Sequence, residues 1–248
     1  MLYYRIFLNF LNKLNFLYLF RTENIKRSLL IKNNEKYSFL HDKAGYKFFC
    51  FSNIFPFSET IYENDIRKLV ISSPDHIFID TLSLSLNTLP NYMVNIGKMK
   101  FKFMDFKKID PIIPKNEPFS LITGTPIIMR ISLEKFSDHK SDFKDFPYFY
   151  WKKNFPLDFF ISQLENTLIK KYEEYCQYQN KVQPNEHVHL FERFRFKKQV
   201  STQIRMKRLS YKVIGTLWIF EFEDWGNRNL IKFALDAGLG ERNCLRKN

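Results

Sequence analysis

The spacing of apolar and polar residues predicts short strands and a few helices along the chain. Residues 98–106 (KMKFKFMDF) alternate lysine with apolar side chains, a period typical of a strand with one buried face. Residues 156–178 instead carry apolar side chains every three or four positions, which predicts a helix with one buried stripe. That stripe consists of Leu157, Phe160, Ile161, Leu164, Leu168, Ile169 and Tyr172. We expect Glu165, Lys170 and Lys171 to point away from it.

The remaining elements are predicted in the same way. The first half is expected to contain strands at residues 3–10, 47–53 and 68–72, a helix reaching about residue 36, and a helix at 74–86. The second half is expected to contain strands at residues 120–133, 190–198 and 212–222 and a helix at 227–237. A charged and aromatic insertion at residues 134–154 precedes the long helix.

The order of these elements predicts an α+β fold of two tandem ferredoxin-like domains. Each half runs strand, helix, strand, strand, helix, and a further strand closes the first half. Single-strand RNA readers use the same helix-backed antiparallel sheet. A connector with Pro111, Pro114 and Pro118 is the candidate boundary. We therefore expect an N-terminal domain at residues 1–109, a linker at 110–118 and a C-terminal domain at 119–248.

The composition is strongly basic. Lys and Arg number 39 against 26 Asp and Glu, which gives a formal net charge of +13. An excess of this size favours a polyanionic partner, either nucleic acid or an anionic membrane surface. A lysine-rich, AT-biased genome is the alternative explanation of the charge. Because 45% of the residues are hydrophobic, the chain can form a core, and this excludes an intrinsically disordered protein.

The cysteines and histidines give no pattern typical of a metal site. Cys50, Cys176 and Cys244 are odd in number and widely spaced, so we expect a reduced, cytoplasmic protein without disulfides. His187 and His189 could share one face of a strand, but no carboxylate or cysteine accompanies them at a ligand spacing. The sequence therefore predicts neither a metal nor a cofactor.

The first 20 residues are rich in apolar side chains but do not predict a membrane span. Polar residues interrupt the run at Arg5, Asn9, Asn12, Lys13 and Asn15, and no small-residue cleavage site follows. An amphipathic helix is an open alternative, since four of these residues fall at helical spacing. It would make the chain a basic peripheral membrane protein.

A basic ribbon between residues 193 and 220 is the first candidate RNA contact. It contains no acidic residue, and its cations are Arg193, Arg195, Lys197, Lys198, Arg205, Lys207, Arg208 and Lys212. Phe194 and Phe196 alternate with the first cations, so a strand here would expose its charges on one face and anchor its rings on the other. The alternative is a solvated edge strand that lysines protect from aggregation.

A second candidate RNA contact follows the last predicted helix. Gly238 and Gly240 are two of only seven glycines, and Arg242 stands two residues further on. Glycines let a backbone approach a phosphate or base closely, and the arginine adds charge. The alternative is a glycine that caps the end of the helix.

The segment GLGERNCL at residues 238–245 closely resembles the glycine-rich signature of the CRISPR-associated repeat-RNA-processing endoribonucleases, the sixth Cas protein of the RAMP superfamily. That signature is usually written GhGxxxxxGhG, where h is hydrophobic, with a basic residue in its middle. Arg246, Lys247 and Asn248 stand where its second GhG is expected. The resemblance therefore implies that the second domain has an incomplete C-terminal strand.

Residues 38–55 (SFLHDKAGYKFFCFSNIF) are similar to another stretch of the same family, in which a helix ends in the catalytic histidine and a strand follows. The resemblance implies that His41 is the catalytic histidine and that Lys47 matches a lysine that assists in some members. Many members also use a tyrosine in the preceding helix, a position that falls here near Ile25 or Lys26. Without the resemblance, His41 would be a helix-end histidine favoured by the helix dipole.

The resemblance also implies the activity. It points to a metal-independent endoribonuclease that cuts precursor RNA within each CRISPR repeat and leaves 5′-hydroxyl and 2′,3′-cyclic phosphate ends. Histidine titrates near neutral pH and can transfer the protons, and a lysine can offset charge on the phosphate. The alternative is a non-catalytic member that binds the same RNA for guide retention or effector assembly. Expected partners are repeat RNA and other Cas effector subunits, with a monomer or homodimer and no membrane.

Overall fold

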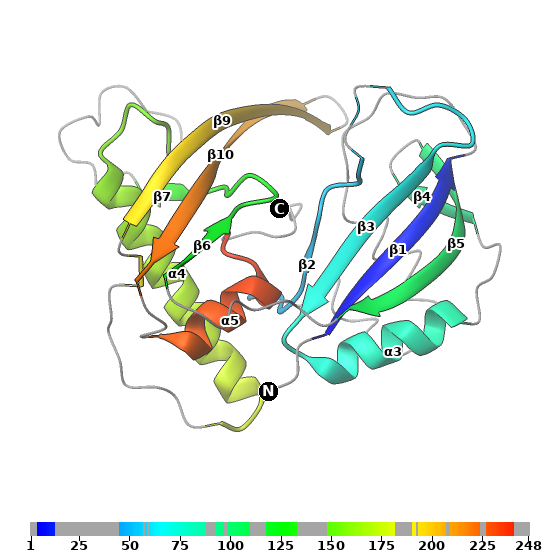
Figure 1. The fold of residues 1–248 in the computed structure, drawn as a ribbon. Helices are drawn as coiled ribbons and strands as arrows, with labels where there is room; N and C mark the ends of the chain where they lie inside the picture. Colours follow the sequence, from blue (N-terminus) through cyan, green and yellow to red (C-terminus); the bar gives the residue numbers. More distant parts are fainter. Residues whose placement is uncertain are drawn as a thin grey trace. The chain divides into compact units, whose positions relative to one another are not determined.

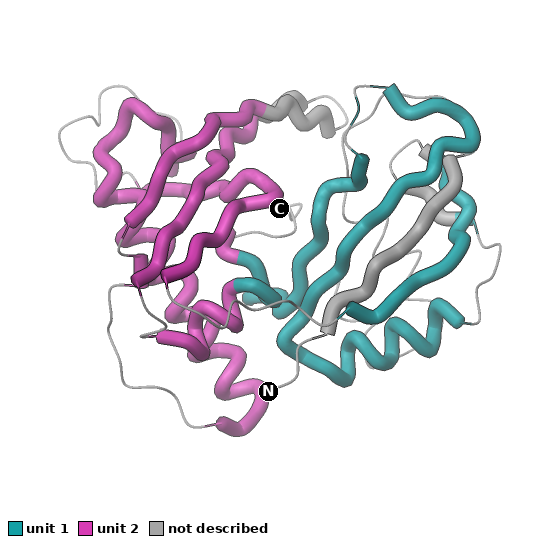
Figure 2. Tube along the Cα trace, in the orientation of Figure 1, with its two compact units in different colours: residues 1–113, 235–238, 242–248 teal, residues 114–234, 239–241 magenta. Residues whose placement is uncertain are grey.

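The computed structural model describes residues 4–12, 45–56, 58, 60–87, 93–96, 99–109, 118–132, 148–181, 190–191, 193–206, 209–223 and 227–240 (Figure 1). The chain divides into two compact units (Figure 2): Met1–Ile113 with Leu235–Gly238 and Arg242–Asn248, and Pro114–Ala234 with Leu239–Glu241. The helix predicted up to residue 36 and residues 110–117 of the predicted linker lie outside the described residues. The domain boundaries drawn from the proline-rich connector therefore stay a prediction.

The first unit is built on a five-stranded antiparallel sheet. Its elements are β1 (Tyr4–Asn12), β2 (Cys50–Phe51), β3 (Ile66–Ser73), α3 (His76–Asn87), β4 (Met93–Ile96) and β5 (Met99–Ile109). The strand order is β2-β3-β1-β5-β4, so the first strand lies in the middle, between β3 and β5. This is the ferredoxin-like arrangement with one additional strand. That strand, β4, pairs with the start of β5, and four residues are too few to give a clear period in the sequence.

The core of the first unit lies between the sheet and α3. Leu69 and Ile71 of β3 and Phe101 and Phe103 of β5 are buried, as the alternating pattern predicts. They share this core with buried residues of α3: Phe78, Ile79, Leu82 and Leu86. The carboxylate of Asp75 accepts the backbone N–H groups of the first helical turn, so α3 begins where the Pro-Asp pair predicts.

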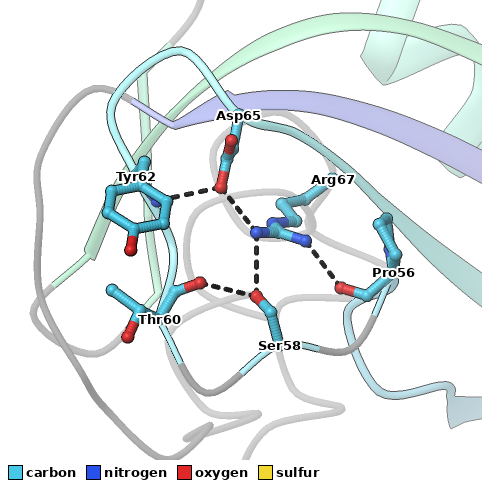
Figure 3. A network of polar contacts seen from close by, with 6 residues as sticks. All are labelled: Pro56, Ser58, Thr60, Tyr62, Asp65 and Arg67. Carbon is cyan, nitrogen blue, oxygen red and sulfur yellow. Dashed lines mark hydrogen bonds and ion pairs between the residues drawn. The ribbon is translucent and has the colours of Figure 1, made fainter.

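A buried guanidinium, that of Arg67 in β3, organises the loop between β2 and β3 (Figure 3). Arg67 is 5% exposed. Its Nη1 donates to the Pro56 carbonyl oxygen at 2.7 Å, and its Nη2 contacts Ser58 Oγ at 2.9 Å and Asp65 Oδ2 at 2.6 Å. Asp65 Oδ2 also accepts the backbone N–H of Tyr62 at 2.9 Å. One arginine side chain therefore fixes both ends of this loop.

The second unit contains a three-stranded sheet, a separate two-stranded ribbon and two helices. Its elements are β6 (Phe119–Ile122), β7 (Arg130–Ser132), β8 (Tyr148–Tyr150), α4 (Leu157–Tyr178), β9 (Arg193–Met206), β10 (Leu209–Phe222) and α5 (Arg228–Ala237), of which the last residues, from Leu235, belong to the first unit. The sheet has the order β6-β10-β9, and β7 pairs with β8. This is again a ferredoxin-like order, shown over three strands in the part that the structure describes. Residues 241–248, where the incomplete final strand is expected, lie outside that part.

The single strand predicted at residues 120–133 is wrong, because this segment forms two strands in two different sheets. Between β6 and β7 the chain bends at Gly124 and Thr125, and Ile127 then pairs with Thr216 of β10 in an isolated bridge. Thr123 holds the turn: its hydroxyl oxygen accepts the backbone N–H of Trp218 at 2.8 Å. The apolar residues on both sides of the turn hid the break.

Trp218 of β10 is the centre of an aromatic core in the second unit. Its ring lies 4.7 Å from that of Phe160 in α4 and 5.6 Å from that of Trp151, centroid to centroid. The indole N–H donates to Thr216 Oγ1 at 2.7 Å, so the polar atom of this buried side chain is satisfied.

Helix α4 confirms the predicted helix but corrects one of its outward residues. Lys171 is only 2% exposed, because it follows Leu168 by three positions and precedes Tyr175 by four, and both of these are buried. Its aliphatic stem packs within the apolar stripe. Lys170 is exposed, and Glu165 is half-buried and accepts the Leu190 backbone N–H at 2.9 Å. In the described residues, no helix is long and apolar enough to cross a bilayer.

Gly215 and Gly124 give a matched test of how closely the turn approaches β10. A Cβ at Gly215 would lie 2.8 Å from Pro126 Cβ, whereas a Cβ at Gly124 would meet no atom within 4 Å. Because Pro126 cannot yield without moving the turn, we expect Gly215→Ala to lower the free energy of unfolding by about 1–3 kcal/mol. Gly124→Ala should change it by less than about 0.5 kcal/mol. Equal urea-unfolding curves for the two variants would contradict the close approach.

Candidate nucleic-acid interface

The hairpin of β9 and β10 presents the predicted basic ribbon. Arg193, Arg195, Lys197 and Lys198 are exposed, whereas Phe194 and Phe196 between them are half-buried. Both phenylalanine rings meet Trp218 edge to face, with centroid distances of 6.4 Å and 5.3 Å. As the alternation predicts, the cations lie on one face of the strand and the rings anchor the other face in the core.

A β-bulge brings two lysines to the same surface. Trp218 pairs with Phe196 and Leu217 pairs with Lys198, so Lys197 is the additional residue between two registered pairs. A bulge breaks the alternation of a strand, and as a result Lys197 and Lys198 are both exposed although they are neighbours. Two adjacent ammonium groups on one face suit contact with successive phosphates.

Arg193 and Arg195 differ from these two lysines, because they have carboxylate partners. Arg193 forms an ion pair with Glu223, and Arg195 Nη2 lies 3.9 Å from Glu221 Oε1. These acids lie at or just beyond the end of β10, outside the stretch of 193–220 that lacks acidic residues. Since all four groups are well exposed, the pairs are weak, and a phosphate could displace either carboxylate.

Lys197 and Lys198 have no carboxylate within ion-pair distance in the part of the chain that the structure describes. Unlike the two arginines, they carry no competing ion pair there. Arg205 belongs to β9. Lys207, Arg208 and Arg242 lie outside the described residues, and their predicted RNA contacts stay predictions.

The segments that carry Lys47 and Gly238 meet within the first unit, although they are far apart in sequence. The Ser72 hydroxyl in β3 donates to the Asp236 carbonyl oxygen at 3.0 Å, and the Cys50 thiol in β2 donates to the same oxygen at 3.4 Å. Cys50 Sγ and Ser72 Oγ are also 2.9 Å apart. Cys50 follows Lys47 by three residues, and Asp236 precedes Gly238 by two. Residues 186 positions apart are thus joined by hydrogen bonds.

Lys47 itself is half-buried and lies at the start of an anchored segment. Ser73 Oγ donates to the Phe48 carbonyl oxygen at 2.5 Å, and the Phe49 ring stacks on Phe78 of α3 with centroids 5.2 Å apart. The strand predicted at residues 47–53 is correct in place but too long, because the strand itself is Cys50–Phe51, and further along only an isolated bridge joins Phe55 to Lys68 of β3. His41 lies outside the described residues, so its role stays a prediction.

Gly238 adopts the left-handed conformation, with φ of 78°, directly after the last residue of α5. This is the position and conformation of a glycine that ends a helix. The capping role raised as the alternative for this glycine is therefore present, and the proposed RNA contact at Gly238 and Gly240 stays untested.

A second group of lysines, which the sequence analysis did not include in the site, lies on the face of the first unit's sheet that points away from α3. On β5, lysines alternate with the buried Phe101 and Phe103, and on β3 a lysine separates the buried Arg67 and Leu69. The register places these lysines on one face, which they share with the exposed Asp105: Lys68, Lys100, Lys102 and Lys107. The alternation at residues 98–106 predicted the strand, and every second residue from 98 to 102 is a lysine. That detail could have identified this surface.

Comparison with known proteins gives consistent matches. The family described as CRISPR associated protein Cas6, C-terminal, matches residues 107–245. CRISPR-associated endoribonuclease Cas6 2 of Methanocaldococcus jannaschii is 31% identical over 228 residues, which cover 87% of this chain and 84% of the relative. Two solved structures share the fold over 97% of this chain and 95% of their own. One is described as CRISPR associated protein Cas6 (TM-score 0.66, 23% identity), the other as an RAMP protein binding different RNA substrates (TM-score 0.67, 20% identity).

Proposed function

Because this chain belongs to the CRISPR-associated Cas6 family, in which its curated relatives are endoribonucleases, we propose that it binds CRISPR repeat RNA and cuts it once within each repeat. The cut needs no metal ion and leaves a 5′-hydroxyl and a 2′,3′-cyclic phosphate. The observation that supports this assignment most directly is the junction of Cys50 and Ser72 with Asp236. It brings together the two segments whose sequences carry the family signatures.

The chemistry requires two proton transfers and one compensating charge. The 2′-oxygen next to the scissile phosphate forms a bond to phosphorus, and the bond from phosphorus to the 5′-oxygen breaks. A base takes the proton of the 2′-hydroxyl, and an acid supplies a proton to the leaving 5′-oxygen. His41 can serve in one of these roles, because imidazole titrates near neutral pH. The Lys47 ammonium offsets the negative charge that develops on the phosphate.

Incubation of the chain with labelled repeat RNA in EDTA tests this function. We expect one cut per repeat. A phosphatase should remove the 3′ phosphate of the upstream product only after the 2′,3′-cyclic phosphate has been hydrolysed to a monoester. Cleavage that depends on added Mg²⁺ would contradict the mechanism. Binding without any product would instead identify a non-catalytic RNA-binding member of the family.

Lys197 and Lys198 are expected to bind RNA phosphates, and the salt dependence of binding measures this. Each phosphate contact on single-stranded RNA contributes about 0.7 to the slope of log K against log salt concentration. Replacing both lysines by glutamine should therefore reduce the slope by about 1.4. Lys170 and Lys181, both exposed on or after α4, provide a control with the same loss of charge, which should leave the slope unchanged. Equal slopes for the two double variants would contradict the contact.

A further inference from the structure

The ribbon of β7 and β8 has one face in the core of the second unit. Ile131 of β7 and Phe149 of β8 form a register pair, and both are buried. Trp151, which directly follows β8, is buried between Phe160 and Trp218, with ring centroids 5.0 Å and 5.6 Å away. Among the described residues of β7 and β8, the fully buried side chains therefore lie on one face.

The other face of the ribbon carries an arginine and two tyrosines in mutual contact. Arg130 pairs with Tyr150 across the strands, and Tyr148 lies two residues before Tyr150, so the three side chains share a face. The Arg130 guanidinium carbon lies 4.6 Å from the centre of the Tyr148 ring. The two tyrosine rings are 6.0 Å apart at 74°. All three side chains are half-buried, so each has accessible surface.

The ribbon is also joined to the basic hairpin. The Lys153 backbone N–H donates to Gln199 Oε1 at 3.2 Å, and Gln199 directly follows the exposed Lys197 and Lys198. Lys152, half-buried beside the Phe155 ring at 5.8 Å, adds a cation between β8 and this contact. The ribbon of β7 and β8 thus contacts β9 at the residue next to Lys198, within the second unit, although Gln199 and Lys198 point to opposite faces of β9.

We propose that Arg130, Tyr148 and Tyr150 form a stacking platform for an unpaired base of the bound RNA. Single-stranded RNA is bound in this way by many proteins, which stack bases on aromatic rings and on guanidinium planes while nearby cations hold the backbone. Both elements are present here: the platform offers ring and guanidinium surface, and two cations, Lys152 and Lys153, directly follow β8. This inference rests on the proposed function, because it assigns a subsite for the same RNA.

Binding of repeat RNA to matched tyrosine variants tests the platform. The RNA carries a 2′-deoxynucleotide at the mapped cleavage site, so that it is not cut. We expect Tyr148→Leu combined with Tyr150→Leu to weaken binding at least about fivefold, since stacking on one base is worth that much or more. Tyr148→Phe combined with Tyr150→Phe keeps both rings and should bind within about twofold of the unchanged chain. Tyr178→Leu, at an exposed tyrosine at the end of α4, should have no effect.

An abasic scan of the RNA identifies the stacked base. Removing the base at one unpaired position should weaken binding to the unchanged chain by the same factor as the double leucine substitution. It should not weaken binding to the double leucine variant any further. If that variant does not fold, Arg130→Lys provides the same comparison, because it keeps the charge and removes the planar guanidinium.

Each outcome separates the platform from the proposed function. If the unchanged chain binds repeat RNA and the leucine variant binds equally well, the tyrosines only stabilise the ribbon, and the platform is excluded while the function stands. The same holds if the abasic effects are identical in the two proteins. If the unchanged chain does not bind repeat RNA, both proposals fail.

Discussion

Replacing His41 by alanine should reduce the rate of repeat-RNA cleavage by about 10²–10⁴-fold, the contribution that a positioned acid or base makes to a proton transfer. Binding of the RNA should change little, because the cations that we propose to hold the phosphates are other residues, among them Lys197 and Lys198. The expected signature is therefore a large loss of the single-turnover rate at nearly constant affinity. Single-turnover cleavage in EDTA, together with a binding titration, measures both quantities.

His76 provides the matched control for His41. It is an exposed histidine at the first position of α3 in the same unit. His76→Ala removes an imidazole without touching either family signature, so its cleavage rate should equal that of the unchanged chain. If both variants cleave at the unchanged rate, His41 is not the catalytic histidine.

Replacing Trp218 by alanine should lower the free energy of unfolding by about 3–5 kcal/mol. The side chain is 1% exposed and meets the rings of Phe160, Phe196 and Trp151, so its loss leaves a large cavity between the sheet and α4. The Trp218 ring also packs against the rings of Phe194 and Phe196. We therefore expect the hairpin that carries Lys197 and Lys198 to lose order as well. Urea unfolding, followed by circular dichroism, measures the free energy.

Trp218→Phe separates packing from hydrogen bonding at this position. It keeps a ring in the core but removes the indole N–H that donates to Thr216 Oγ1. We expect a loss of about 1–3 kcal/mol, smaller than that of the alanine variant. A loss in the alanine variant of less than about 1 kcal/mol would show that the aromatic cluster contributes little to stability.

The periodic parts of the fold could be predicted from the sequence, and the interrupted parts could not. The alternation in β5 and the apolar stripe of α4 predicted most of the length of both elements. In each of them the buried residues follow the period of the strand or the helix. The prediction of one strand at residues 120–133 failed, because apolar residues continue through the turn between β6 and β7, which the Thr123 hydroxyl holds. The prediction that Lys171 points outward failed for a different reason, because a lysine can bury its aliphatic stem inside an apolar stripe.

The candidate site divides in a similar way. The exposed face of the basic ribbon could be predicted from the alternation of cations with Phe194 and Phe196. The bulge at Lys197 could not, because it depends on the register of β9 with β10. The ion pairs of Arg193 and Arg195 depend on Glu221 at the end of the partner strand β10 and on Glu223 just beyond it. The contact of Ser72 with Asp236 is a tertiary contact, and no local pattern in the sequence predicts it.

Cleavage of repeat RNA in EDTA, with and without a single 2′-deoxynucleotide at the cut site, tests the central claim most directly. The proposed mechanism uses that 2′-hydroxyl as the nucleophile. We therefore expect complete cleavage of the all-RNA repeat and none of the substituted repeat, with equal binding of both. Cleavage of the substituted repeat, or a requirement for a divalent metal ion with the all-RNA repeat, would contradict it.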